Sequence, residues 1–193
     1  MLSLEESLKI LKETRALIEG HFILSSGLHS PRYVQCAQLM SKPKQATKIC
    51  KSLVEKINIE FNDINLILSP AIGGIVVGYE IGKLMNIETI FSERVKGEFQ
   101  LRRDFKIKQS TNVLIVEDVI TTGKSSIECS KLVTKNKANI VGYACIIDRS
   151  NGKTEINEKI ISQIKLKIPT YEKENLPKEL VSIEPVKPGS RNL

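Results

Sequence analysis

The sequence has no tryptophan, and aromatic residues make up only 5% of its 193 residues. Surfaces that stack the bases of single-stranded nucleic acid depend on aromatic side chains, so such a surface is not expected. No apolar run approaches the roughly 20 residues that span a bilayer, and the first residues, MLSLEESLKILKETRALIEG, lack the apolar stretch of a signal peptide. We therefore expect a cytoplasmic protein without a membrane segment.

Metal-ligating residues are few and scattered. The sequence contains four cysteines and two histidines, namely Cys36, Cys50, Cys129, Cys145, His21 and His29. No two cysteines form a C-x-x-C pair, the tight spacing on which structural zinc sites depend. We therefore expect no structural zinc, and cysteines that are buried in a reducing compartment.

Charge of one sign is in excess. Lys and Arg number 29 against 22 Asp and Glu, which gives a net charge of +7. Such a balance is compatible with a nucleic-acid ligand or with a polyanionic small molecule, and it does not choose between them. Hydrophobic residues at 41% and charged residues at 26% are typical of an ordinary globular protein, and the length predicts a single domain over 1–193.

The order of apolar segments predicts an α/β fold. Near-continuous β-branched runs alternate with helical patterns, which indicates parallel strands flanked by helices. We expect strands at 64–68, 87–91, 113–116, 140–147 and, near an edge, 164–168, and helices over 3–20, from about 43, over 73–85 and over 123–136. Residues 22–36 predict a small hairpin-like lobe, so that 1–40 comprise a helix and a hood segment and 60–150 the core. From Pro169 onward the prolines predict an extended strap.

The segment from Val113 to Ser126 carries the clearest chemical signal. An apolar strand leads directly into Glu117 and Asp118, and Thr121–Ser125 then open a helix. Paired carboxylates can accept hydrogen bonds from vicinal hydroxyls or hold a divalent ion, while the N–H groups and dipole of a helix N-terminus favour a phosphate. Ligands of parallel sheets bind where the strands end. This pattern predicts a site for a ribose 5-phosphate.

A nucleotide-binding P-loop is a competing interpretation of the same residues. Gly123-Lys124-Ser125 matches the end of the G-x-x-x-x-G-K-[ST] pattern. The first glycine of that pattern, however, falls on Asp118, whose carboxylate would face the phosphates that the loop should hold. The sequence therefore disfavours a P-loop.

The motif E-D-V-I-T-T-G-K-S resembles the ribose-phosphate signature of type I phosphoribosyltransferases. The resemblance implies that family's fold, a parallel sheet flanked by helices with a small N-terminal hood, and the binding of 5-phospho-α-D-ribose 1-diphosphate (PRPP) with Mg²⁺. Ser69–Gly74 resemble the pyrophosphate-side loop of the family. The implied PRPP contacts are Glu117, Asp118, Val119, Ile120, Thr121, Thr122, Gly123, Lys124, Ser125, Arg94, Ile72 and Gly73. Mg²⁺ is implied to be held mainly through PRPP and water, with no direct protein ligand.

Two further segments resemble orotate phosphoribosyltransferases. F-I-L-S-S-G-L-H-S-P-R-Y, residues 22–33, is similar to their N-terminal segment, and Asp148-Arg149 to their base-side loop. A guanidinium binds the carboxylate of orotate well. The implied orotate contacts are Thr121, Arg149, Tyr33, Ser26 and Gly27. The closing V-K-P-G-S-R, residues 186–191, resembles the end of a shorter bacterial and archaeal branch.

Residues 92–110 form a polar connection whose length is typical of a binding loop or lid. The resemblance identifies it as a mobile catalytic loop that reaches the partner's site in a homodimer with shared active sites, and it implies catalytic roles for Arg94, Lys96 and Asp118. The chain departs from many relatives in having Ser25 and Ile72 where they have lysine. The loop supplies Arg94, Lys96, Arg102 and Arg103 but no histidine.

Two alternatives remain at this point. The base acted on is uracil or a purine instead of orotate, or the protein is a regulator of the same fold that senses PRPP and binds nucleic acid. The net charge favours the regulator slightly, whereas the 22–33 segment and Arg149 favour the orotate enzyme.

Overall fold

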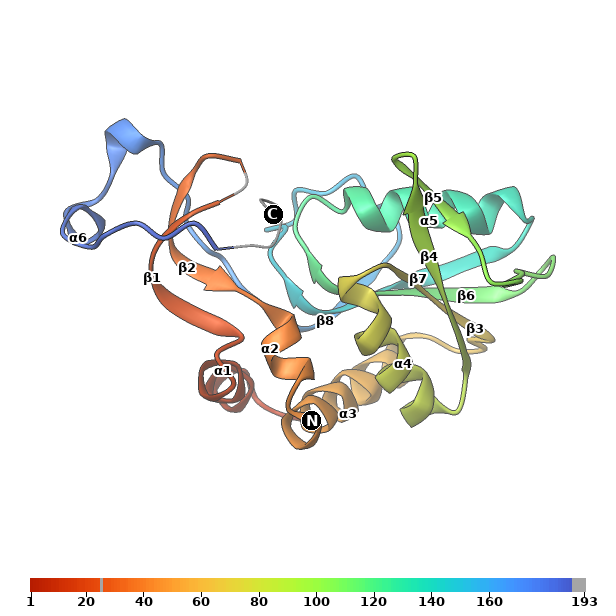
Figure 1. Cartoon of the computed structure of the whole chain (residues 1–193). Coiled ribbons are helices and arrows are strands. Elements are labelled where there is room, and N and C mark those ends of the chain that lie inside the picture. The colour runs from red at the N-terminus through yellow and green to blue at the C-terminus, as the bar shows by residue number, and fades with distance from the viewer. Residues whose placement is uncertain (25, 189–193) are drawn as a thin grey trace.

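The central feature of the computed structural model, which describes residues 1–24 and 26–188, is a six-stranded sheet (Figure 1). Its spatial order is β5 (Glu98–Leu101), β4 (Glu88–Val95), β3 (Leu66–Pro70), β6 (Asn112–Ile120), β7 (Asn139–Asp148) and β8 (Ile160–Lys165). From β4 to β8 the neighbouring strands are parallel, and β5 pairs antiparallel with β4. The predicted parallel sheet is confirmed, and its edge strand lies at 160–165 rather than 164–168.

Helices cover both faces of this sheet, as Figure 1 shows. On one face pack α1 (Leu4–Glu13), α3 (Pro43–Glu60) and α4 (Gly73–Met85), and on the other packs α5 (Lys124–Lys135). The helical spacing of apolar residues predicted α3, whose Ile49, Leu53 and Ile57 are fully buried. Two hydrophobic clusters, one on each side of the sheet, make up the core.

A separate two-stranded sheet forms the predicted hood. It consists of β1 (Leu17–Ile23) and β2 (His29–Val34), which are antiparallel and lead into the short helix α2 (Cys36–Met40). The hairpin therefore begins earlier than the predicted residue 22.

The first helix is correspondingly shorter than predicted. It ends at Glu13 instead of reaching Gly20, because the Thr14 hydroxyl donates to the Ile10 carbonyl and Arg15 takes a left-handed conformation with φ of 58°. Ile18 does not continue the helical stripe but pairs with Tyr33 in the hairpin.

The segment expected to be a loop at 92–110 starts as a β-hairpin. Strand β4 continues to Val95, and the chain then turns at Lys96 and Gly97 into β5. Both turn residues have positive φ, 52° and 89°, which is the conformation that two-residue hairpin turns demand. Phe99, within β5 of this hairpin, is buried. The mobility of residues 92–110 stays a prediction.

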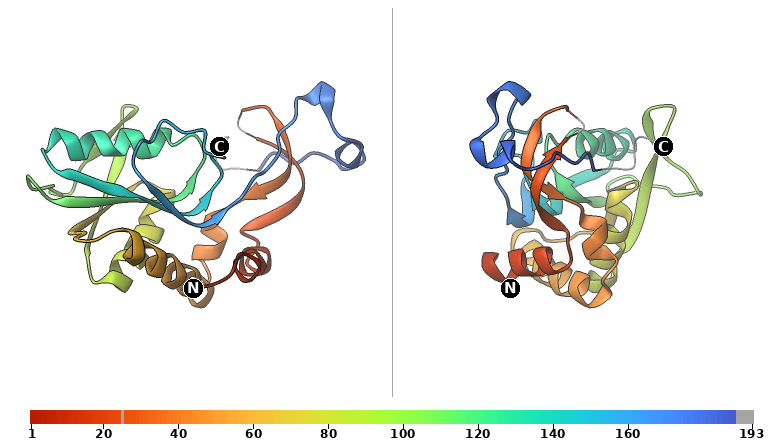
Figure 2. Two further views of the ribbon diagram at one scale, coloured as in Figure 1. Left: turned by 180° about the vertical axis from the view of Figure 1, so that it is seen from behind. Right: turned by 60° about the vertical axis from the view of Figure 1, so that its left-hand side comes forward.

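The tail after Pro169 contains a 3₁₀ turn (Lys173–Asn175) and α6 (Lys178–Val181). Between these elements it is extended, as predicted, and Figure 2 shows it running beside the β1–β2 hairpin. Ser25 and residues 189–193, the latter containing the second half of the V-K-P-G-S-R motif, lie outside the described residues. Within residues 1–24 and 26–188, no helix combines the length and hydropathy that crossing a membrane requires.

Candidate active site

Glu117 and Asp118 lie within β6 rather than after it. The strand was predicted to end at Val116, but its pairing with β7 continues to Ile120, which lies opposite Asp148. Successive side chains of a strand point to opposite faces of the sheet. The two carboxylates consequently face different helices.

Glu117 faces α5. Its carboxylate accepts a hydrogen bond from the Ser126 hydroxyl in the first turn of that helix. Burial raises the pKa of Glu117 to about 7, and the neighbouring Asp118 acts in the same direction, while the Ser126 hydrogen bond and the charge of Arg94 oppose the shift. The group therefore changes its protonation state near neutral pH.

Asp118 faces the beginning of α4. A Cβ atom placed on Gly73 would lie 2.8 Å from both of its carboxylate oxygens, so only glycine leaves room for the carboxylate here. Burial raises the pKa of Asp118, whereas a hydrogen bond from the Val119 N–H, 2.9 Å long, opposes the rise. The predicted pyrophosphate-side loop and the acidic pair are thus in direct contact.

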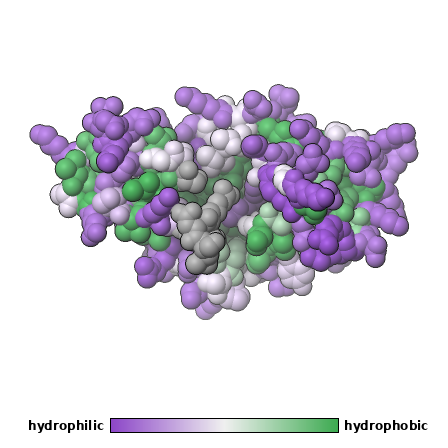
Figure 3. All heavy atoms as spheres, turned by 45° about the horizontal axis from the view of Figure 1, so that its top comes forward, coloured by the Kyte–Doolittle hydropathy of each residue, from purple (hydrophilic) through white to green (hydrophobic). Residues whose placement is uncertain are grey.

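The loop at 121–125 leads into the N-terminus of α5, and its binding of a phosphate stays a prediction. Gly123 caps α5 with φ of 77°, and a side chain there would collide with Thr154 and Ile156. The first N–H groups of a helix have no partners within it, and they point with the positive end of the helix dipole toward the loop. A hollow of about 690 Å³ adjoins the loop and is lined by Thr122, Lys124 and Lys153, among others. Hydrophilic side chains predominate on this side of the molecule (Figure 3).

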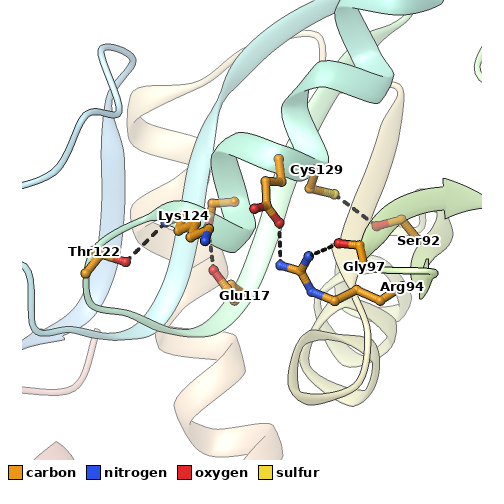
Figure 4. A network of polar contacts seen from close by, with 9 residues as sticks. Ser92, Arg94, Gly97, Glu117, Thr122, Lys124 and Cys129 are labelled. Carbon is orange, nitrogen blue, oxygen red and sulfur yellow. Dashed lines mark hydrogen bonds and ion pairs between the residues drawn. The ribbon is translucent and has the colours of Figure 1, made fainter. Parts of the chain in front are cut away.

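Arg94 approaches the same loop from β4 (Figure 4). Its guanidinium donates to the Glu128 carboxylate on α5 and, over 2.7 Å, to the Gly97 carbonyl. It also lies over the Phe99 ring, 4.2 Å from the ring centre. These three contacts fix the plane of the guanidinium near Glu117, whose pKa its charge lowers.

Arg149 is held beside the end of β6. Its backbone N–H donates to the Ile120 carbonyl over 2.8 Å, which places the residue next to the ribose-phosphate motif. Its Nε is buried and has no hydrogen-bond partner among the described residues. Burial lowers the pKa of Arg149, and the proximity of Tyr33 on β2 opposes that shift. The hood and the base-side loop therefore face one another.

Three predicted residues are not joined to the acidic pair. Ser26 and Gly27 lie in the turn between β1 and β2, and Lys96 lies in the turn between β4 and β5. The hydrogen bonds found in residues 1–24 and 26–188 link none of the three to Glu117 or Asp118. Their substrate contacts stay predictions.

Sequence reasoning missed Ser126 and Glu128. Both lie on α5 and bind residues that the sequence did single out, Glu117 and Arg94 respectively. The four-residue spacing puts Lys124 and Glu128 on one face of α5. Nothing in the sequence, however, predicts that this face lies next to β4.

Comparison with known proteins identifies the family. A family model described as the phosphoribosyl transferase domain matches residues 35–178. A protein named orotate phosphoribosyltransferase, from Parvibaculum lavamentivorans, is 45% identical over 190 residues, which cover 98% of each chain. The chain belongs to the orotate phosphoribosyltransferase family. The resemblance noted from the sequence is confirmed.

Other phosphoribosyltransferases agree in sequence and in fold. The orotate phosphoribosyltransferase of Methylorubrum extorquens is 45% identical over 190 residues, covering 98% of this chain and 97% of that protein. The crystal structure of orotate phosphoribosyltransferase from Aeropyrum pernix superposes with a TM-score of 0.72 at 23% identity, over 82% of this chain and 92% of that one. The latter likeness establishes the type I phosphoribosyltransferase fold that was predicted.

Proposed function

We propose that this protein transfers the ribose 5-phosphate group of PRPP to orotate, giving orotidine 5′-phosphate and pyrophosphate, in pyrimidine nucleotide synthesis. The family membership supports the reaction class, and Arg149 carries the choice of base. The Nε of Arg149 is buried beside the ribose loop and has no hydrogen-bond partner within residues 1–24 and 26–188, which fits an anionic base. Uracil and the purines have no carboxylate to offer it. Tyr33, Ser26, Gly27 and Thr121 would complete the orotate site.

The residues for PRPP follow the strand ends. The loop 121–125, with the N-terminus of α5, would bind the 5-phosphate, and the main chain of Val119 and Ile120 would lead the loop over the ribose. Ile72 and Gly73, at the start of α4, and Arg94 would bind the diphosphate. Glu117 and Asp118 approach the ribose from opposite faces of β6, where each can accept a hydrogen bond from one ribose hydroxyl.

The proposed transfer does not require a nucleophilic side chain of the protein. As the C1′–O bond to the diphosphate breaks and N1 of orotate forms its bond to C1′, positive charge develops on the ribose and negative charge on the leaving group. The proton displaced from N1 leaves with the pyrophosphate. The carboxylates of Glu117 and Asp118 would stabilise the positive charge on the ribose. Arg94, with Lys96 as a further catalytic cation, would stabilise the negative charge on the diphosphate. Closure of 92–110 would exclude the water that hydrolyses PRPP.

Mg²⁺ fits this site as an ion bound mainly through substrate. The carboxylates of Glu117 and Asp118 face different helices, so they do not converge as a protein cage would. Mg²⁺ takes oxygen ligands and characteristically keeps several waters while binding substrate phosphates. When bound it would neutralise charge on the diphosphate.

The α4 helix supports a homodimer. The exposed side chains of its N-cap residue Ile72 and of Val76 and Tyr79, at 85%, 51% and 65% exposure, form an apolar stripe at i, i+4 and i+7 beside the active-site loop. We propose that a second copy covers this stripe, so that 92–110 of each copy reaches the other's site. We further propose that residues 1–193 form one domain and, because all four cysteines are free and buried, that it works in the cytoplasm.

The deciding experiment measures base-dependent consumption of PRPP by the purified protein with Mg²⁺. We expect pyrophosphate release with orotate and none with uracil, hypoxanthine or adenine. Turnover with one of these bases but not with orotate would contradict the base assignment. Binding of PRPP and of nucleic acid without turnover of any base would instead favour a regulator of this fold.

A further inference from the structure

The tail covers both outer edges of the hood hairpin. Residues 169–188, called the strap, pair with β2 through Tyr171, whose N–H and carbonyl bond to the His29 backbone over 2.9 and 2.8 Å. They pair with β1 through Val186, which donates to the His21 carbonyl over 2.8 Å and accepts from the Ile23 N–H over 2.9 Å. Isolated two-stranded hairpins are marginally stable at best, so the strap supplies the missing edge partners (Figure 2).

Two buried histidines join these two edge contacts. His21 Nε2 lies 2.6 Å from His29 Nδ1, and His21 Nδ1 lies 2.8 Å from the Ile183 carbonyl of the strap. The side chains are only 3% and 5% exposed. Because a carbonyl only accepts, His21 Nδ1 must carry a proton, and a neutral His21 then accepts at Nε2 from the Nδ1–H of His29. One line of hydrogen bonds thus runs from β2 through β1 into the strap.

The hairpin so fastened carries residues of the proposed orotate site. Tyr33 on β2 lies close enough to Arg149 to influence its pKa, and Phe22 on β1 packs against Tyr33 with ring centres 5.7 Å apart. The height of the hairpin above the sheet therefore sets the distance between Tyr33 and Arg149. The strap itself contributes none of the residues proposed to contact PRPP.

We propose that His21 and His29 are positioning residues that lock the strap across the hairpin and thereby hold Tyr33 opposite Arg149 for orotate. The inference rests on the proposed function and adds a determinant of orotate affinity that lies away from the substrate. Loss of the hydrogen bonds between His29, His21 and the strap weakens the binding of orotate selectively. The PRPP loop belongs to β6 and α5, and the pairing of the strap is with β1 and β2 instead.

The test compares His29→Ala with His29→Asn. Alanine leaves Nε2 of His21 without its donor, whereas the Asn amide can place an N–H near the position of Nδ1. We expect alanine to raise the KM for orotate about tenfold, the loss typical of one buried hydrogen bond, while the KM for PRPP and kcat stay within about twofold. Asparagine should recover most of the affinity. The control is Val181→Ala, an exposed strap residue that should change none of these constants.

Amide hydrogen exchange supplies a readout apart from activity. In His29→Ala the amides of Tyr171 and Val186 should exchange faster, whereas amides of β6 should keep their protection. Val186→Pro removes the N–H that bonds to His21 from an exposed position and should raise the KM for orotate in the same way. This variant decides the matter if His29→Ala does not fold.

The failure of this inference is distinct from failure of the proposed function. If the wild-type protein shows no orotate-dependent turnover, the proposed function is wrong. If the wild type is active and the variants raise both KM values equally, lower kcat alone or change nothing, the histidines only stabilise the fold and the inference is overturned.

Discussion

Glu117 and Asp118 are adjacent in sequence but point to opposite faces of β6, Glu117 toward Ser126 on α5 and Asp118 toward Gly73 on α4. Both are partly buried with raised pKa values, yet each depends on a different helix for its environment. Substitutions of the two acids or of their partners should therefore have separable effects.

Replacing Glu117 with Gln should flatten the pH dependence of stability. The pKa of Glu117 is raised from 4.5 to about 7, so between these values the unfolded chain loses a proton that the folded protein keeps. Its contribution is fully present below pH 4.5 and is lost as pH rises through 7, a fall on the order of 3 kcal/mol in the free energy of unfolding. Urea denaturation at pH 4.5 to 8 measures the slope. Glu98→Gln, at an exposed carboxylate, is the control and should leave the slope unchanged.

Gly73→Ala should impair turnover through Asp118. The new Cβ would lie 2.8 Å from the carboxylate oxygens, so the carboxylate or the start of α4 must move. We expect kcat to fall about tenfold or more with a folded protein by circular dichroism. Because the alanine acts on Asp118, its effect should be much smaller in an Asp118→Asn background. Equal effects in both backgrounds would contradict this coupling.

Arg94→Lys should lower kcat/KM for PRPP by about a hundredfold, the scale of losing one hydrogen-bond donor positioned at a developing anion, although the positive charge is kept. The planar guanidinium of Arg94 donates to Glu128 and to Gly97 at the same time, and the ammonium of lysine cannot reproduce this geometry. Glu128→Gln keeps an acceptor oxygen and should cost much less than Glu128→Ala. Initial rates at varied PRPP test the series, with Arg15→Lys, at an exposed residue, as the control. A wild-type rate for Arg94→Lys would remove Arg94 from the mechanism.

Arg149→Ala should raise the KM for orotate much more than the KM for PRPP. The Nε donor of Arg149 is buried and unpaired among the residues that the structure describes, so removing the guanidinium takes away the partner proposed for the orotate carboxylate. Arg149→Lys should recover only part of the affinity, because an ammonium lacks the bidentate geometry. Equal increases of both KM values would refute the role assigned to Arg149.

Tyr79→Glu should convert the proposed dimer into a monomer. A charge at the end of the apolar stripe, next to Val76, would lose its water on association. Analytical ultracentrifugation measures the change. Ile59→Glu, at a 68% exposed position on α3, should leave the mass unchanged. A wild-type protein that sediments as a monomer would itself contradict the dimer.

Local patterns in the sequence were enough to identify the five parallel strands, the helices α3, α4 and α5, and the Glu117–Ser125 motif. The periodicity of strands and helices and the spacing of a turn depend on a few neighbouring residues, so these elements can be predicted from the local sequence. Where the prediction was wrong, at the end of α1 and at the hairpin of 92–101, the decision came from backbone conformations at Arg15, Lys96 and Gly97 and from strand pairing.

The sequence by itself therefore determined the order of elements, the acidic pair with its phosphate loop, and the presence of Arg149 after a strand. Only the tertiary structure decided that Arg94 binds Glu128, 34 residues away, and that His21 holds the strap across 162 residues. These contacts depend on which strands become neighbours and on the register of their pairing. Local sequence patterns predict neither of these, because strand pairing is determined by how the whole core packs.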